Sequence, residues 1–328
     1  MKRFVSVVLV LAACISIVML ASCGNQAGGS TAAAGEKKEY RFVMIPILSQ
    51  AWFDIVYNAA VDAADKLSAE TGYKITIDYQ APATADPVVQ NELLERVIAT
   101  EPDGIAIDCT DINVTIPILE EAMARGIPVI LYASTAPPGK LIPHVGNNYY
   151  EQGAREAEEL VQRLNGRGKV GIIHGVPTNP PHAERFQAIH DVFAKYPGIQ
   201  IVAEAYDYDD IENAQREAAA ILSANPDLSG FAVCDAAGPV GVGVALKEAG
   251  KKPGEVKYVG IDDLPQLQEL MREGYLDLSI ATQPNNIGRW CVISMFMENL
   301  GFRPITFYDT KYALLTPDLV KDGVIEGF

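Results

Sequence analysis

The sequence contains few cysteines, five among 328 residues. Cys14 and Cys23 stand near the beginning, which leaves Cys109, Cys234 and Cys291 for the remainder of the chain. An odd number of cysteines without close spacing is not typical of a disulfide framework or of a structural zinc site. We therefore expect neither.

Positive charge is also scarce. The chain has 26 lysines and arginines against 42 aspartates and glutamates, which gives a net charge of -16. A protein that binds nucleic acid must neutralise phosphates with cationic side chains. The charge balance therefore excludes nucleic acid as a partner.

One long uncharged run, residues 4–22, stands at the beginning of the chain. Lys2 and Arg3 precede it and small residues end it, which is typical of a secretory signal peptide over residues 1–22. The ending LASC resembles the lipobox of bacterial lipoproteins. This resemblance implies that Cys23 is lipidated and becomes the new N-terminus.

Residues 23–38 are small and polar after the cysteine, as a flexible tether would be. The alternative for the run before them is an uncleaved anchor helix, because its length is almost enough to span a bilayer. Both interpretations predict an extracytoplasmic protein that is held at a membrane.

A chain of 328 residues with 49% apolar residues is too long for one typical core and predicts two domains. From Tyr40 onward, β-rich runs alternate with amphipathic helices, which predicts an α/β protein with two doubly wound, parallel-sheet lobes. The expected strands are 40–48, 73–79, 104–108 and 127–132, then 169–175, 199–206, 230–235, 256–262 and 276–282. The expected helices are 53–70, 87–100 and 114–125, then 149–164, 182–196, 212–224, 239–250, 265–274 and 286–300.

Polar and aromatic residues follow the carboxyl ends of these strands, where open α/β sheets bind ligands. Each one taken alone could be a turn residue or a helix N-cap. Together they would converge on one cleft if the two lobes face each other. The residues are Gln50, Trp52, Phe53, Asp108, Asp111, Asn147, Asp235, Asp262 and Gln283.

From Tyr40 to about Val324, the order and spacing of several motifs resemble those of periplasmic sugar-binding proteins of the ribose-binding type. The motifs are AWF, EPDGIAIDCTD, ARGIPVIL, HVGNNYYEQG, GKVGIIHG, AERFQAI, ILSANPDLSGFAVCDAAG, VKYVGIDD and TQPNNIG. The resemblance implies a type I periplasmic-binding-protein fold, whose chain crosses between its lobes three times. It implies an N-terminal lobe of residues 39–146 plus 283–308 and a C-terminal lobe of residues 147–282 plus 309–328.

The resemblance also implies which residues bind the ligand. Arg185 matches a family arginine, although Ala188 and Ile189 replace the Gly-Phe that follows it there. Asp235 stands where an asparagine is usual, and Tyr208 stands in for a family aromatic. The complete set of matched positions is Gln50, Trp52, Phe53, Asp108, Arg185, Tyr208, Asp235, Asp262 and Gln283.

One departure concerns the segment LYASTAPP. Members of the family commonly carry an Asp-Arg pair where this chain has Ala133 and Ser134. Loss of two charged groups changes which hydroxyl pattern the site satisfies. We therefore expect a polyol, a deoxysugar or another small polar ligand in preference to ribose or a common hexose.

The chemistry of such a site follows from the residue types. Carboxylates accept hydrogen bonds from sugar hydroxyls, and an arginine donates in a planar fork. Trp52 and Phe53 would cover the apolar face of the sugar. The alternative is a hydrophobic staple on the helix, and the helical spacing of Phe53 with Val56 and Ala60 supports it.

The sequence also suggests two other kinds of site. Gly238, Gly241 and Gly243 imitate a dinucleotide fingerprint, but their order is wrong and Pro239 stands among them. Four histidines could suggest a metal, yet solvated or capping roles fit their spacing better. These are His144, His174, His182 and His190. We therefore expect no cofactor and no metal.

A secreted glycosidase could use two cleft aspartates, but the sequence marks neither as a proton donor. A transcription regulator of this fold would need a DNA-binding segment where the signal peptide stands. We therefore predict a monomeric, non-enzymatic lipoprotein that binds a sugar or polyol and delivers it to an ABC permease. The alternatives are a nucleoside-binding lipoprotein, or a sensory one that contacts a chemoreceptor or a sensor kinase.

Overall fold

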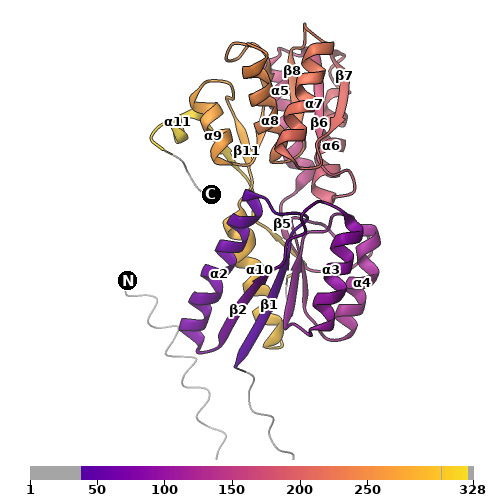
Figure 1. The fold of residues 1–328 in the computed structure, drawn as a ribbon, viewed down its shortest axis with the longest axis vertical. Helices are drawn as coiled ribbons and strands as arrows, with labels where there is room; N and C mark the ends of the chain where they lie inside the picture. Colours follow the sequence, from indigo (N-terminus) through magenta and orange to yellow (C-terminus); the bar gives the residue numbers. More distant parts are fainter. Residues whose placement is uncertain (1–37, 304, 324–328) are drawn as a thin grey trace, which may run out of the picture. The chain divides into compact units, whose positions relative to one another are not determined.

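A computed structural model describes residues 38–303 and 305–323 (Figure 1). The predicted signal peptide, Cys23 and all of the predicted tether except Lys38 lie outside these residues. None of the helices in the described residues has the length and apolar character needed to cross a membrane.

Five strands from the first half of the chain and one strand near its end form a six-stranded sheet in the order β12-β5-β4-β3-β1-β2, and every neighbouring pair in it is parallel. Its strands are β1 Glu39–Ile45, β2 Lys74–Tyr79, β3 Gly104–Ile107, β4 Val129–Tyr132, β5 His144–Gly146 and β12 Phe307–Asp309. Its helices are α2 Ala51–Thr71, α3 Pro87–Ala99, α4 Ile112–Ala124 and α10 Pro284–Asn299. We call these elements the N-lobe.

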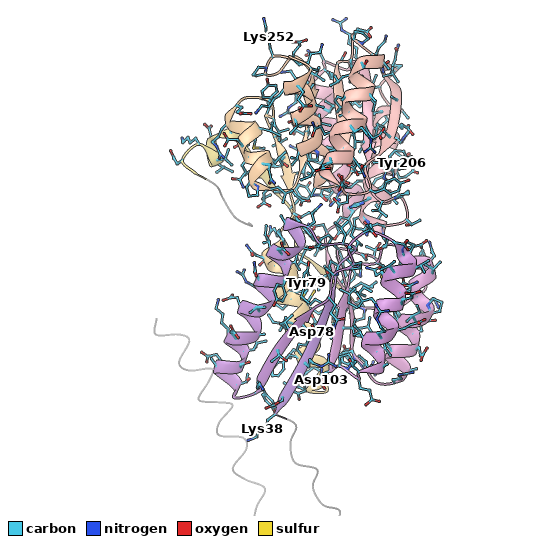
Figure 2. The ribbon with its side chains drawn as sticks, in the orientation of Figure 1. Lys38, Asp78, Tyr79, Asp103, Tyr206 and Lys252 are labelled. Atoms are coloured by element: carbon cyan, nitrogen blue, oxygen red, sulfur yellow. The ribbon has the colours of Figure 1, made fainter. Side chains whose placement is uncertain are left out.

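The apolar run of β1 explains why helices cover both faces of this sheet. Phe42 and Met44 belong to the same buried cluster as residues of α2 and α10. Val43 and Ile45 point to the opposite face and pack in a second cluster with residues of α3 and α4. A strand that is apolar at successive positions must be buried on both faces. Figure 2 shows Lys38 before β1 and Tyr79 at the carboxyl end of β2.

The remaining elements, which we call the C-lobe, form two sheets. Strands β6 Arg167–His174, β7 Gly198–Tyr206, β8 Gly230–Val233 and β9 Lys257–Tyr258 are parallel, in the order β7-β6-β8-β9. Strands β10 Gly260–Ile261, β11 Ser279–Ala281 and β13 Ala313–Leu315 follow one another in the second sheet, where β13 is antiparallel to β11. The helices are α5 Tyr149–Arg163, α6 Pro180–Phe193, α7 Ile211–Ala224, α8 Ala237–Glu248, α9 Pro265–Arg272 and α11 Pro317–Val320.

The predicted α/β class with parallel sheets is confirmed. One difference is the strand expected over 256–262, which is divided at Val259 into β9 and β10. These two pieces pair in different sheets, β9 with β8 and β10 with β11. The expected elements also do not include β5, β12, β13 or α11, because segments of three or four residues show no readable periodicity.

The chain passes between the two lobes at three places: after β5, after β11 and after β12. Each passage is short, so the carboxyl ends of strands from both lobes lie near the connections. Asn147 follows β5 directly, and its Nδ2 donates a hydrogen bond to the carbonyl of Lys311, which follows β12. The exact limits of the lobes given above stay a prediction.

Candidate ligand-binding site

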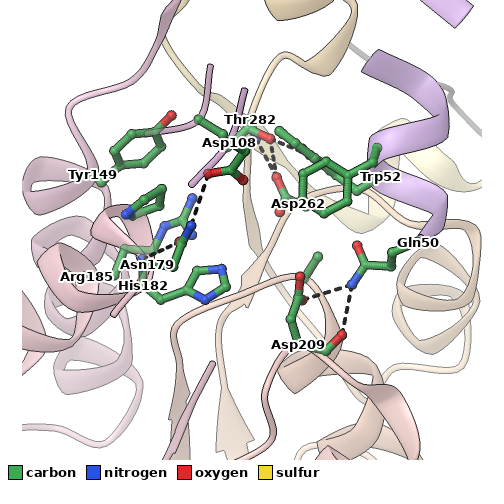
Figure 3. Close-up of a pocket in the computed structure, with 14 residues that line it drawn as sticks. Gln50, Trp52, Asp108, Tyr149, Asn179, His182, Arg185, Asp209, Asp262 and Thr282 are labelled. Atoms are coloured by element: carbon green, nitrogen blue, oxygen red, sulfur yellow. Dashed lines mark hydrogen bonds between the residues drawn. The ribbon is translucent and has the colours of Figure 1, made fainter. Parts of the chain in front are cut away.

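A pocket lies at the carboxyl ends of the strands, and residues of both lobes line it (Figure 3). About 370 Å³ of space, which includes the solvent at its mouth, is free of protein atoms. Its polar lining is mostly buried. The lining residues are Gln50, Trp52, Phe53, Asp108, Ala133, Tyr149, Asn179, Pro181, His182, Arg185, Asp209, Ala236, Asp262 and Thr282.

Trp52 and Phe53 stand in the first turn of α2, directly after the loop that follows β1. Their rings meet edge to face with centroids 5.1 Å apart. Both line the pocket, and both also belong to the buried core cluster that contains Val56 and Ala60. The aromatic pair therefore joins the pocket wall to the core, so the two roles considered from the sequence are not exclusive.

Asp108 follows β3 and is almost fully buried. Its Oδ1 accepts hydrogen bonds from Ser134 Oγ at 2.5 Å and from Asn179 Nδ2 at 3.0 Å. Burial raises the pKa of Asp108 to about 7, because the apolar surroundings disfavour its charged form. Ser134, which stands where the family's Asp-Arg pair is expected, thus positions a carboxyl group of this pocket.

Asp262 follows β10 in a left-handed backbone conformation, with φ 66°. Its Oδ1 accepts hydrogen bonds from the amide and the hydroxyl of Thr282. Trp52 Nε1 in turn donates to Thr282 Oγ1 at 2.9 Å. A non-glycine residue in this conformation is strained, and such strain is common at functional sites. The chain of hydrogen bonds fixes Asp262 relative to the aromatic wall.

Arg185 lies on α6 and is 4% exposed. Its Nε donates to Gln152 Oε1 at 2.9 Å and its Nη1 donates to the carbonyl of Cys234 at 2.9 Å. The guanidinium stands over the ring of Tyr149, 5.1 Å from the centroid. Among the described residues, the guanidinium forms no ion pair with a carboxylate. Its partners are therefore neutral.

Asp209 lies in the segment YDYDD after β7 and is not among the site residues predicted from the sequence. Tyr208 and Asp209 both have left-handed backbone conformations, with φ 58° and 60°. The amide of Asp209 donates to Asp207 Oδ1 at 2.9 Å, and Gln50 Nε2 donates to Asp209 Oδ1 at 2.8 Å. Asp209 lines the pocket, whereas the side chain of Tyr208 is 53% exposed. The only sequence feature that could have predicted Asp209 as a site residue is its place in an acidic segment at the end of a strand.

Five predicted site residues do not line the pocket. Asp111 caps α4, and Gln283 accepts from Asn286 Nδ2 at 2.5 Å before α10. Asp235 is buried beside the pocket wall and accepts from the amide of Gly238 at 2.8 Å. The others are Asn147 and Tyr208, whose surroundings are given above.

His182 differs from the solvated or capping role that the sequence favoured. It is buried in the pocket wall, and its Nδ1 accepts a hydrogen bond from the amide of Val176 at 2.9 Å. Burial lowers the pKa of His182 well below its ordinary value. His182 and Asn179 stand at the start of the helix after β6. They could have been predicted from the tendency of α/β sheets to bind ligands at the carboxyl ends of their strands.

The arrangement offers acceptors, donors and an apolar wall within one buried space. This combination suits a small ligand with hydroxyl groups, because each hydroxyl both donates and accepts hydrogen bonds.

Residues 41–298 match the model of the periplasmic binding protein domain, so the chain belongs to this family. It is 25% identical over 243 residues to the D-apiose import binding protein of Actinobacillus succinogenes, which covers 74% of this chain and 76% of that protein. It is 26% identical over 250 residues to the D-ribose/D-allose-binding protein of Pseudomonas aeruginosa, which covers 74% and 73%.

The structure is also similar to that of an ABC transporter solute-binding protein from Burkholderia graminis in complex with D-arabinose. The TM-score is 0.81 at 27% sequence identity, over 88% of this chain and 99% of that one. Membership of this family implies a location outside the cytoplasm. The suspected family resemblance is thereby confirmed.

Proposed function

We propose that this protein captures a sugar or sugar-like small molecule in the pocket between its lobes and delivers it to an ABC importer. The observation that carries this proposal is the pocket itself, in which Asp108, Asp262 and Arg185 lie beside the aromatic wall of Trp52 and Phe53. The related proteins that bind apiose, ribose or allose support the ligand class.

We also propose that the protein releases its ligand unchanged. The buried carboxyl groups of the pocket accept hydrogen bonds from neutral groups that hold them in place, such as Ser134 and Asn179 for Asp108. Such an arrangement is suited to binding and positioning. A non-catalytic role also agrees with the solute-binding transport proteins to which the chain is related.

A ligand panel tests the binding proposal. Thermal unfolding and titration calorimetry with pentoses, hexoses, polyols and nucleosides should identify at least one sugar or polyol that binds saturably at micromolar concentration and is recovered unchanged. Asp262→Asn should weaken that binding, whereas Asp111→Asn, a helix cap outside the pocket, should not. Binding of nucleosides alone, or conversion of a bound sugar to product, would contradict the proposal.

We further propose that Cys23 carries a lipid that anchors the mature protein. The support is the sequence alone: the ending LASC and the small, polar residues after it. Cys23→Ser should release the protein from membranes or leave its precursor unprocessed, as followed by fractionation and gel mobility. A variant that fractionates and migrates as the wild type does would contradict the anchor.

A further inference from the structure

The pocket region contains far more acidic than basic groups. Arg185 is the one cation that lines the pocket, because His182 is held neutral by its burial and its bond from Val176. Five aspartates lie in or directly beside the pocket, and each is at most 4% exposed. They are Asp108, Asp207, Asp209, Asp235 and Asp262.

In the described part of the chain, none of these aspartates forms an ion pair. The partners of Asp108, Asp209 and Asp262 are hydroxyls, amides and backbone N–H groups. The carboxyl groups of Asp207 and Asp235 contact each other, and apart from that contact one oxygen of each is buried without a hydrogen-bond partner. Buried charges are ordinarily paired. The excess of carboxyl groups therefore indicates that a positive partner comes with the ligand.

Asp209 is the best placed to receive that partner. Burial, followed by the like charges of Asp235, Asp262 and Asp108, raises the pKa of Asp209 well above the ordinary value. Figure 3 draws Asp209 beyond His182, on the other side from Arg185. Its side chain has one donor, Gln50, and its backbone is held in a strained conformation.

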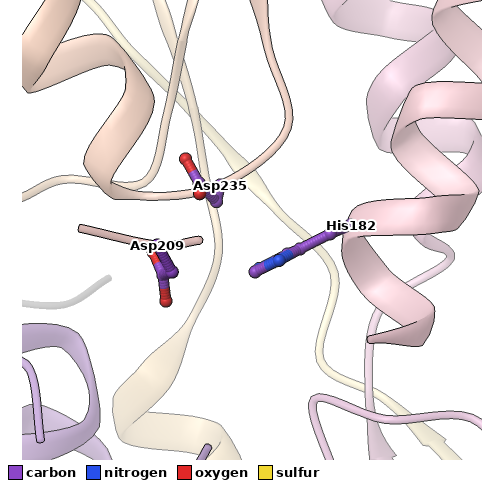
Figure 4. A group of neighbouring side chains, drawn as sticks. All are labelled: His182, Asp209 and Asp235. Carbon is purple, nitrogen blue, oxygen red and sulfur yellow. The ribbon is translucent and has the colours of Figure 1, made fainter. Parts of the chain in front are cut away.

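A metal ion is one cation to consider. His182, Asp209 and Asp235 offer ligand atoms that all lie within 4.8 Å of one another (Figure 4). However, Nδ1 of His182 already accepts a hydrogen bond from Val176. The proton of a neutral imidazole must then be on Nε2, where a metal would need a lone pair. His182 is thus a donor and cannot itself hold a cation, so only the carboxyl groups of Asp209 and Asp235 in this cluster can accept hydrogen bonds from a cationic group.

We propose that the ligand is an amino sugar or amino polyol, whose protonated amine is held by Asp209 next to Asp235. This proposal rests on the sugar-binding function proposed above. An ammonium group donates three hydrogen bonds and accepts none. It matches a site where acceptors lack partners, and the hydroxyls of the same ligand would reach Arg185 and Asp108.

This proposal predicts proton release on binding. The titratable groups around Asp209 are Asp108, Asp207, Asp235, Asp262 and His182. Burial raises the pKa of each of these aspartates. An ammonium group favours their charged forms, so binding would displace protons. The affinity for an amine should therefore increase as the pH rises from about 5 to about 7, a range in which the amine stays mostly protonated.

Matched pairs of compounds test the proposal by calorimetry at neutral pH. The amine members are glucosamine, galactosamine, glucamine and amino-inositol, and the neutral members are glucose, galactose, sorbitol and myo-inositol. N-acetylglucosamine controls for the size of the substituent. In at least one pair the amine should bind about tenfold tighter or more, with proton release measured in two buffers of different ionisation enthalpy.

Asp209→Asn should remove that preference, because it should lower the affinity for the amine at least about tenfold more than the affinity for the neutral member of the pair. Asp210→Asn is the matched control, because Asp210 caps α7 outside the pocket and asparagine also caps helices well. The control should behave as the wild type does. Proton release by the wild type is a second readout that does not depend on how well the variant folds.

The remaining outcomes overturn the proposal. Neutral members that bind as tightly as their amines would refute the amine while leaving the sugar-binding function intact. Binding by no member of either set would count against both. Stabilisation by Mg²⁺, Ca²⁺ or Zn²⁺ alone, lost in Asp209→Asn, would replace the amine with a metal ion.

Discussion

At the scale of single residues, Trp52 connects the pocket with the core. It is 6% exposed, packs with Phe53 and donates a hydrogen bond to Thr282. Because Thr282 in turn donates to Asp262, a change at Trp52 reaches a carboxyl group of the pocket. This residue therefore affects both affinity and the order of the site.

Trp52→Ala should weaken binding of the sugar identified by the panel by about 1–3 kcal/mol, because apolar burial is lost. Trp52→Phe should keep most of that burial and lose about 1 kcal/mol with the indole hydrogen bond. Calorimetry measures both. Trp290→Phe is the control, since Trp290 stacks on Tyr308 away from the pocket. Equal affinity of Trp52→Ala and the wild type would mean that the residue serves only the core.

A second residue-scale prediction concerns pH. The pKa of Asp108 rises from 3.8 to about 7 in the folded protein, so the folded state binds more protons than the unfolded state between these values. The stability that this proton contributes is fully present below pH 4 or so and is lost as the pH rises through about 7. The ligand-free protein should thus unfold at a lower temperature at pH 8 than at pH 5, as followed by calorimetry or circular dichroism.

Asp108→Asn tests this assignment. Asparagine keeps an acceptor for Ser134 and Asn179 and removes the buried charge. The variant should be more stable than the wild type at about pH 8, by on the order of 1 kcal/mol or more, and its stability should depend less on pH. A stability profile with unchanged slope would show that other groups dominate the titration.

At the scale of elements, the close approach of α5 and α6 positions Arg185. A Cβ atom on Gly153 of α5 would lie 2.6 Å from both Cα and the carbonyl oxygen of Arg185. Only glycine therefore allows the two helices to pack at this distance. Gln152, the neighbour of Gly153, receives the Nε hydrogen bond of the same arginine.

Gly153→Ala should destabilise the protein by about 1–3 kcal/mol through overpacking. It should also weaken ligand binding, because α6 and the Arg185 backbone must move. Thermal unfolding and calorimetry separate the two effects. Glu158→Ala, an exposed position on the same helix, should change neither by much. Intact affinity in Gly153→Ala would mean that the position of Arg185 does not depend on this contact.

At the scale of the whole molecule, hydrogen bonds join the two lobes around the pocket. Gln50 contacts Asp209, as described above. Thr135 Oγ1 donates to Glu184 Oε1 at 2.7 Å, and Thr178 Oγ1 donates to the carbonyl of Thr110 at 2.8 Å. Neither threonine lines the pocket. These two bonds should therefore stabilise the arrangement of the lobes described here, which we call the closed state, without touching the ligand.

Replacing both threonines, Thr135→Val with Thr178→Val, should lower affinity by about 5- to 150-fold, since each hydrogen bond contributes about 0.5–1.5 kcal/mol and only the closed state binds tightly. The loss should appear in the dissociation rate, and small-angle scattering of the ligand-free variant should show a more open particle. Thr71→Val, whose hydroxyl bonds within its own helix, is the control. Unchanged dissociation would mean that these bonds do not control closure.

Parts of the candidate site were readable from the sequence. Six residues named in advance line the pocket: Gln50, Trp52, Phe53, Asp108, Arg185 and Asp262. Strand ends mark them because parallel strands bring their carboxyl ends to one edge. Asp111 and Gln283 also follow strands, but their side chains bond to residues at the starts of helices. Position after a strand does not distinguish such a residue from one that contacts a ligand.

The sequence by itself determined the α/β class, the alternation of strands and helices, and the family. The reason is that the spacing of apolar residues, the length of each strand and the turn residues are local properties of the chain. Only the tertiary structure decided which carboxyl groups share the pocket, because their distances depend on how two separately wound lobes meet. It placed Asp209 against Gln50, 159 residues away in sequence, and it left Arg185 as the one cation among the residues that line the pocket. The positive charge expected on the ligand therefore follows from how the two lobes pack around the pocket, and no local sequence pattern indicates it.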